Sequence, residues 1–271
     1  MNSKDYKTYR NILEIKTLPI NEAINIKTLE DVKNNPLFKD FDLRKEDLEL
    51  VLAPKDCIKN YDFYRAISVY DTSVNIADIK GTMHPCYQNR SWLLMLMGLN
   101  RSKHSCNIEA TIKAIHNLKG SKISLAKYDC YYFIEGDGNH RVCQARFLRL
   151  EKVPCVVSEY VLDEALLSLY HQLVSIDGVD IPDTFSRNCY IGQSLRIQYL
   201  GHDIHLKFNE HDISILCEIV NKAKLDSRNC LKILINNICL YFDDQSRTSF
   251  SIVDKDMSRL YRAILKGLCR K

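Results

Sequence analysis

The chain has 271 residues, of which 46% are apolar and 27% are charged, and these ordinary proportions exclude a wholly disordered protein. The net charge of +4 permits a nucleic-acid partner but lacks the large positive excess that dedicated nucleic-acid binders carry. No apolar run approaches the roughly 20 residues needed to span a bilayer, so we expect no membrane partner.

Residues 1–65 are predicted to form an N-terminal helical extension. Two helices are expected there, over residues 28–38 and residues 43–52, and Pro54 is expected to end the second. Residues 1–16 are polar and charged, without the apolar stretch of a signal peptide. We therefore expect a cytoplasmic location.

The middle region, residues 66–165, is predicted to be a mixed-sheet core. Residues 109–118 show apolar side chains at helical spacing, whereas short apolar runs bounded by turn residues predict strands. The expected strands are residues 67–70, 74–76, 123–125, 131–134 and 153–157, and the expected helices are residues 90–97, 109–118 and 142–150. A helix between two strands predicts a crossover connection packed on a sheet.

The last region, residues 166–271, is predicted to be α+β. Apolar runs on either side of Gly201-His202 predict a hairpin with strands at residues 194–199 and 203–208. Helices are expected over residues 164–174, 210–223, 227–238 and 255–268. The predicted fold class of the whole chain is therefore α+β, with a mixed-sheet core between a helical extension and an α+β region.

Eleven cysteines are present, and their spacing indicates buried, reduced thiols. No pair has the C-x-x-C spacing of a zinc knuckle, and several lie in apolar runs where a thiol behaves as a small hydrophobe. An odd number without a signal peptide fits the reducing cytoplasm better than a disulfide framework.

The strongest chemical signal is a polar turn that follows the apolar strand over residues 131–134 and leads directly into a helix. Glycine accepts positive φ and lets the backbone approach a ligand, and the first amides of a helix favour an anion. Histidine and arginine at the start of the helix add donors suited to phosphate oxygens. The predicted phosphate-binding residues of the turn are Gly136, Gly138, Asn139, His140 and Arg141.

Asp137 lies between the two glycines, where its carboxylate repels an anion unless a cation separates them. We therefore predict Asp137 as a ligand of Mg²⁺ and as a catalytic residue. His140 is the second predicted catalytic residue, as a proton shuttle or general base. The alternative for Asp137 is that it caps the helix or stabilises the turn.

Gly138-Asn139-His140-Arg141, followed by an apolar helix and then Val153-Pro154-Cys155-Val156-Val157, resembles the signature half of the ParB/sulfiredoxin superfamily. The nearest variant is the Asp-Gly-His-His-Arg turn of its free serine kinases. The resemblance implies a ParB/sulfiredoxin-like core over residues 66–165, whose turn holds the phosphates of ATP or CTP. We expect His84 and Arg90, on a polar upstream loop, to face the same cleft.

The chain also departs from this superfamily. Asn139 stands where sulfiredoxins carry a nucleophilic cysteine, and an amide cannot form the sulfur adduct. No helix-turn-helix pattern follows the core, which disfavours the ParB clamp. Phosphoryl transfer of the serine-kinase type needs a further catalytic acid, for which Glu109, Asp78 and Glu135 remain open.

Three functions are compatible with these patterns. The first is a nucleotide-binding NTPase or phosphotransferase that uses Mg²⁺. The second is a plasmid- or phage-borne DNA-binding regulator or nuclease of the ParB type, because residues 186–271 hold 14 Lys/Arg against 9 Asp/Glu. The third is a non-catalytic interaction protein. Any of the three is compatible with an oligomer. The candidate DNA contacts are Lys222, Lys224, Arg228, Lys232, Arg259 and Arg262.

Overall fold

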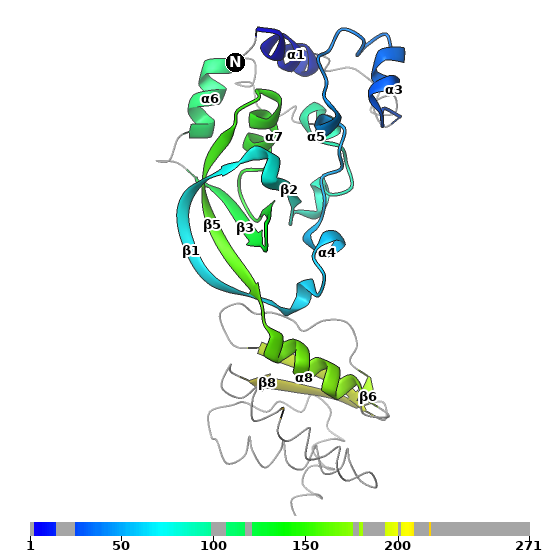
Figure 1. Ribbon diagram of the computed structural model, residues 1–271, viewed down its shortest axis with the longest axis vertical. Helices are drawn as coiled ribbons and strands as arrows, with labels where there is room; N and C mark the ends of the chain where they lie inside the picture. The colour runs from blue at the N-terminus through cyan, green and yellow to red at the C-terminus, as the bar shows by residue number, and fades with distance from the viewer. Residues whose placement is uncertain are drawn as a thin grey trace, which may run out of the picture. The chain divides into compact units, whose positions relative to one another are not determined.

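The computed structural model of the protein describes most of the first 175 residues and short parts of the remainder. The described residues are 3–14, 25–98, 107–116, 121–175, 179–180, 193–199, 202–208 and 217. Contacts divide the chain into two units, which we describe separately (Figure 1). One unit comprises Met1–Lys59 and Ala66–Val161, and the other comprises Asn60–Arg65 and Leu162–Lys271.

A five-stranded mixed sheet with the strand order β1-β5-β3-β4-β2 forms the centre of the first unit (Figure 1). β3 and β4 are antiparallel, whereas β2 runs parallel to β4 and β5 runs parallel to β3. The bounds are β1 Tyr64–Asn75, β2 Ile79–Thr82, β3 Ile123–Tyr128, β4 Tyr131–Ile134 and β5 Lys152–Leu162. The prediction of an α+β fold with a mixed sheet is thus confirmed.

The hairpin of β3 and β4 follows directly from its sequence. Ile123, Leu125 and Ile134 are at most 1% exposed, because they lie on the face of the hairpin that the core covers. Asp129 makes the turn at φ 52°, a left-handed conformation that aspartate tolerates better than most residues. This hairpin fixes the position of the polar turn at the carboxyl end of β4.

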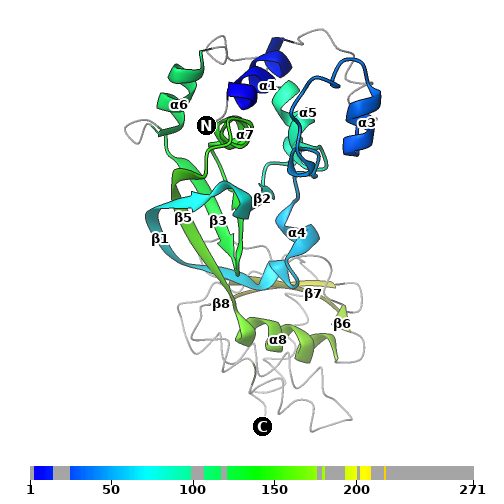
Figure 2. The same cartoon turned by 45° about the horizontal axis from the view of Figure 1, so that its top comes forward.

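Six helices of the described residues belong to the first unit. They are α1 Ser3–Glu14, α3 Leu29–Asn34, α4 Pro54–Cys57, α5 Trp92–Met97, α6 Ile108–His116 and α7 Asn139–Phe147. α7 contacts both α5 and α6, and Figure 2 shows it between them. The Ser91 hydroxyl caps α5 by accepting from the Leu94 amide at 3.2 Å. Trp92 and Leu93 then enter the core, at most 1% exposed.

The second unit contains helix α8 (Glu164–Val174) and a separate antiparallel sheet of β6 (Val179–Asp180), β7 (Gln193–Tyr199) and β8 (His202–Phe208). Asp163 starts α8 because its Oδ1 accepts from the Leu166 amide at 2.9 Å. The predicted helix over residues 164–174 and the predicted hairpin are confirmed. Among the described helices, none combines the length and apolar character that crossing a bilayer requires.

Several predictions fall outside the described residues. These are the helices over residues 210–223, 227–238 and 255–268 and the candidate DNA contacts Lys222, Lys224, Arg228, Lys232, Arg259 and Arg262. They stay predictions.

The predicted helix over residues 43–52 is wrong. Only a single 3-10 turn, Lys45–Asp47, forms there. The following residues instead pair with a distant segment, since Val51 N donates to the Arg90 carbonyl at 2.7 Å and Trp92 N to the Glu49 carbonyl at 3.1 Å. These long-range hydrogen bonds outweigh the local helical pattern.

Candidate functional site

The carboxyl ends of the parallel strands β2 and β4 lie side by side and bring two loops together. The Thr82 hydroxyl donates to the Ile134 carbonyl at 3.1 Å, and the Met83 amide donates to the same carbonyl at 2.8 Å. The loop after β2 therefore starts beside the turn after β4. Crevices at the carboxyl ends of parallel strands are a common place for ligands in α/β sheets.

The turn after β4 is fixed to β3 and depends on a glycine. Glu135 N donates to the Ser124 carbonyl at 2.9 Å, and Ser124 N donates to the Asp137 carbonyl at 3.0 Å. Gly138 has a φ of 122°, and a Cβ there would lie 2.9 Å from the Ile123 side chain. Only glycine fits both restrictions, so the turn has a defined backbone.

Several backbone amides of this turn and of the start of α7 have no partner within the described part of the chain. Among the described residues, no acceptor is found for the amides of Gly136, Asp137, Asn139 and Arg141. Open amides at the start of a helix, together with the helix dipole, are suited to binding an anion. The backbone of the turn is therefore compatible with the phosphate binding that the sequence predicts for its residues.

The Asp137 carboxylate lies within this set of donors. It accepts hydrogen bonds from the Ser121 side chain and the Gly138 amide, and its Oδ2 lies 3.1 Å from Arg141 Nη2. These hydrogen bonds, the one from Ser121 first, hold the pKa of Asp137 below its usual value. The Asp137 side chain is still 60% exposed, whereas that of Arg141 is 16% exposed. The alternative role, in which Asp137 stabilises the turn, is therefore present in the structure.

Arg141 is held in place from two sides. Besides its contact with Asp137, its Nη1 donates to the Ser121 carbonyl. The guanidinium is thus anchored next to the open amides, and a bound anion has to share it with Asp137. Ser121 lies 20 residues upstream, and the sequence patterns did not single it out.

His140 and His84 are connected through an aromatic ring that sequence reasoning also missed. His140 Nε2 lies 2.9 Å from the Tyr87 hydroxyl, and the two rings meet edge to face at 5.8 Å. The His84 ring lies 5.1 Å from the Tyr87 ring. Both predicted histidines therefore belong to one cluster at the start of α7, with Tyr87 between them.

Asn139 is a buried first residue of α7. It is 7% exposed, and its Nδ2 donates to the Gly136 carbonyl at 3.2 Å. Its Oδ1 is buried and has no hydrogen-bond partner among the described residues. A buried acceptor without a donor is costly, so this oxygen is a candidate contact for a ligand that carries a donor or a cation.

The remaining candidates lie elsewhere or have other partners. Arg90 lines a separate pocket and has no contact with the turn among the described residues. Of the three open acids only Glu135 belongs to the turn, and it accepts from the Tyr160 hydroxyl at 2.6 Å. Glu109 is exposed on α6, and Asp78 accepts from Asn75 Nδ2 at 3.1 Å. In the described part of the chain, no group of three His, Cys, Asp or Glu forms a ready metal site.

Cys143, one turn into α7, is not a nucleophile of this site. Its side chain is fully buried, and burial raises the pKa of the thiol far above its usual value. We predict that iodoacetamide at pH 8 alkylates the exposed Cys86 and Cys130 at least about a hundredfold faster than Cys143, because a buried thiol reacts only after local opening. Peptide mass spectrometry over time measures the rates. Comparable rates for the three thiols would contradict the burial of Cys143.

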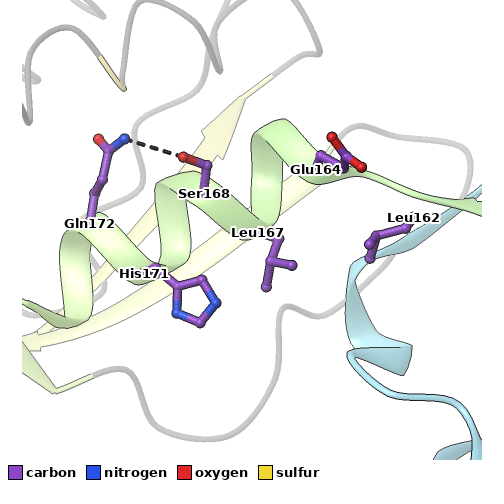
Figure 3. A pocket seen from close by; sticks show the side chains of 6 residues that line it. All are labelled: Leu162, Glu164, Leu167, Ser168, His171 and Gln172. Atoms are coloured by element: carbon purple, nitrogen blue, oxygen red, sulfur yellow. Dashed lines mark hydrogen bonds between the residues drawn. The ribbon is translucent and has the colours of Figure 1, made fainter.

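The second unit has a shallow cavity of about 600 Å³ on α8 (Figure 3). Ser168 and Gln172 point to one side of the helix, where the Gln172 amide donates to Ser168 Oγ at 3.3 Å. Leu167 and His171 point to the other side. The serine and histidine therefore do not form a catalytic pair, and the turn after β4 remains the candidate site.

Comparisons with known proteins assign no family to this chain. No family model, no curated protein and no solved structure matches the chain. The resemblance to the ParB/sulfiredoxin superfamily stays a prediction from the residues of the turn.

Proposed function

We propose that the protein binds a nucleoside triphosphate, ATP or CTP, through its phosphates at the turn after β4, in a ParB/sulfiredoxin-like core. The observation that carries the proposal is a set of amides, at Gly136, Asp137, Asn139 and Arg141, that have no acceptor among the described residues, on a backbone that Gly138 fixes. A preformed set of N–H donors binds phosphate oxygens without a reorganisation cost.

The side chains at the edge of the turn add charge and hydrogen bonds. Arg141 offers a planar fork that matches phosphate oxygens. His140 and Tyr87, 2.9 Å apart, offer a proton-carrying pair beside the same amides. His84 contributes a second ring to this wall. These groups are the ones that hydrolysis or phosphoryl transfer would use.

Mg²⁺ fits the turn only together with the nucleotide. Asp137 is the one carboxylate among residues 136–141, and Mg²⁺ commonly takes one or two carboxylates with water and phosphate oxygens as the other ligands. Asp137 is 60% exposed, so its carboxylate remains open to a cation from the solvent side. When bound, the metal would neutralise charge on the phosphates. The buried Asn139 Oδ1 is a second oxygen of the kind that Mg²⁺ accepts.

Calorimetric titration of the full chain with ATP, CTP and their diphosphates, with and without Mg²⁺, tests the proposal. We expect Arg141→Gln to weaken the binding of triphosphate at least about tenfold, because a charge-assisted contact to phosphate is lost. Arg10→Gln, at an exposed position of α1, is the matched control and should leave the affinity unchanged. No binding of any nucleotide by the wild type at micromolar protein concentration would remove the proposal.

Asp137→Asn separates two roles of the carboxylate. As a Mg²⁺ ligand, Asp137 is expected to be needed for the increase in affinity that Mg²⁺ gives, so the variant should lose about tenfold in the presence of Mg²⁺ only. The affinities with Mg²⁺ and with EDTA, measured side by side, check this. Tighter binding by the variant under both conditions would show instead that Asp137 competes with the phosphate for Arg141.

A further inference from the structure

A second pocket in the first unit lies away from the turn after β4. Its volume is about 800 Å³, within the range of small-molecule sites. None of its lining residues belongs to the turn or to α7. Its apolar walls are formed by Ile26, Leu48, Leu50, Leu94 and Met97.

The pocket is preformed by paired backbone segments. Asn89 N donates to the Val51 carbonyl at 3.0 Å, and Val51 N donates to the Arg90 carbonyl at 2.7 Å. These bonds fix the segment with Leu50 against the segment with Arg90. Leu50 is 53% exposed, so its side chain is accessible to a ligand in this pocket.

The charge at this pocket is of one sign. Lys27 and Arg90 line it, and no acidic residue does. Neither cation forms an ion pair within the described part of the chain. Asp31, four residues after Lys27, is the N3 residue of the capping box of α3, where its carboxylate accepts from the amides of Lys27 and Thr28 at 2.9 and 2.7 Å. Two cations at an apolar pocket are complementary to an amphipathic anion.

We propose that this pocket binds a small organic anion that has an apolar body and one terminal charged group, either a carboxylate or a phosphate. The apolar body lies against Leu50, Leu94 and Met97, and the charged end lies between Lys27 and Arg90. This site is separate from the nucleotide site proposed above, so either proposal can fail without the other.

The test is a calorimetric titration of the full chain with octanoate, octyl phosphate and 1-octanol. We expect at least one anion to bind at least about tenfold more tightly than the alcohol, because charged hydrogen bonds add to the apolar contact. The preferred anion identifies the charged group. Raising the salt to about 0.5 M should weaken binding of the anion but not of the alcohol, because salt screens exposed charges.

Two variants assign the contacts. The double variant Lys27→Gln, Arg90→Gln should lower the affinity for the anion about tenfold and leave that for octanol unchanged, and Arg10→Gln with Lys39→Gln is its control. Leu50→Ser should weaken all three ligands, whereas Leu37→Ser, at a leucine that is 41% exposed outside the pocket, should weaken none. Equal affinity for octanol and both anions, or no binding at millimolar concentrations, would overturn the proposal.

Discussion

Replacing Gly81 with alanine should lower the free energy of unfolding of the first unit by about 3 kcal/mol or more, because main-chain atoms occupy the space of the new methyl group. A Cβ on Gly81 would lie 1.9 Å from the Leu52 carbonyl oxygen and 2.5 Å from the Leu52 nitrogen. Leu52 cannot move aside freely. Its amide donates to the Lys80 carbonyl at 3.2 Å, and its carbonyl accepts from Thr82 N at 3.0 Å.

The substitution of Gly81 should also affect the candidate site. Displacing Leu52 breaks its two hydrogen bonds to Lys80 and Thr82 of β2, and Thr82 also anchors the following loop to Ile134. Each of these buried hydrogen bonds contributes about 1 kcal/mol, and the overpacking adds to their loss. We therefore expect Gly81→Ala to weaken nucleotide binding as well, through the loss of the neighbouring strand end.

Urea unfolding followed by tryptophan fluorescence measures the effect. Trp92 is the only tryptophan of the chain and is 1% exposed in the first unit, so its signal reports this unit. Gly136→Ala is the matched control, because no atom lies within 4 Å of a Cβ there and the change should stay within about 0.5 kcal/mol. Equal stabilities of the two variants would show that Leu52 does not pair with β2.

Local patterns predicted the elements that depend on local contacts. The helix over residues 164–174 has its own apolar stripe and the Asp163 cap, and the β3–β4 hairpin has its own turn at Asp129. β2 was missed, because a strand of four residues that includes Gly81 has no clear alternation. β2 forms because it pairs with β4 and bridges to Leu52. Both partners are distant in sequence, so a local sequence pattern cannot predict these pairings.

In the candidate site too, local sequence predicted the parts that are close together in the chain and missed those that are far apart. Its backbone could be predicted, because the two glycines, the strand before them and the helix after them are consecutive. The contact between Asp137 and Arg141 also follows from their spacing of four residues on a helix start. Tyr87 and Ser121 could not be predicted, because they come from segments 53 and 20 residues away from their partners His140 and Arg141.

Asp47→Asn should lower the stability of the first unit by about 3 to 5 kcal/mol, because it removes one partner of a buried ion pair and leaves the other uncompensated. The Asp47 side chain is 0% exposed, and both of its oxygens accept from Arg149, each at 2.6 Å. It also accepts from the Arg44 amide at 2.8 Å. An asparagine keeps the shape and the contact with Arg44 but leaves Arg149, 11% exposed, without its counter-charge.

The control variant makes the same change from aspartate to asparagine in an exposed ion pair, so it shows how much of the effect depends on burial. Asp71→Asn removes a carboxylate that pairs with Lys122 at 2.8 Å, but these side chains are 68% and 37% exposed, so the change should stay within about 1 kcal/mol. Combining Asp47→Leu with Arg149→Met should recover much of the stability that Asp47→Asn loses, since no buried charge then remains unpaired. A small effect of Asp47→Asn, like that of Asp71→Asn, would mean that water reaches the pair. Arg149 lies beyond the end of α7, whereas the turn after β4 lies before its start. Asp47→Asn should therefore leave unchanged any nucleotide affinity of the folded fraction.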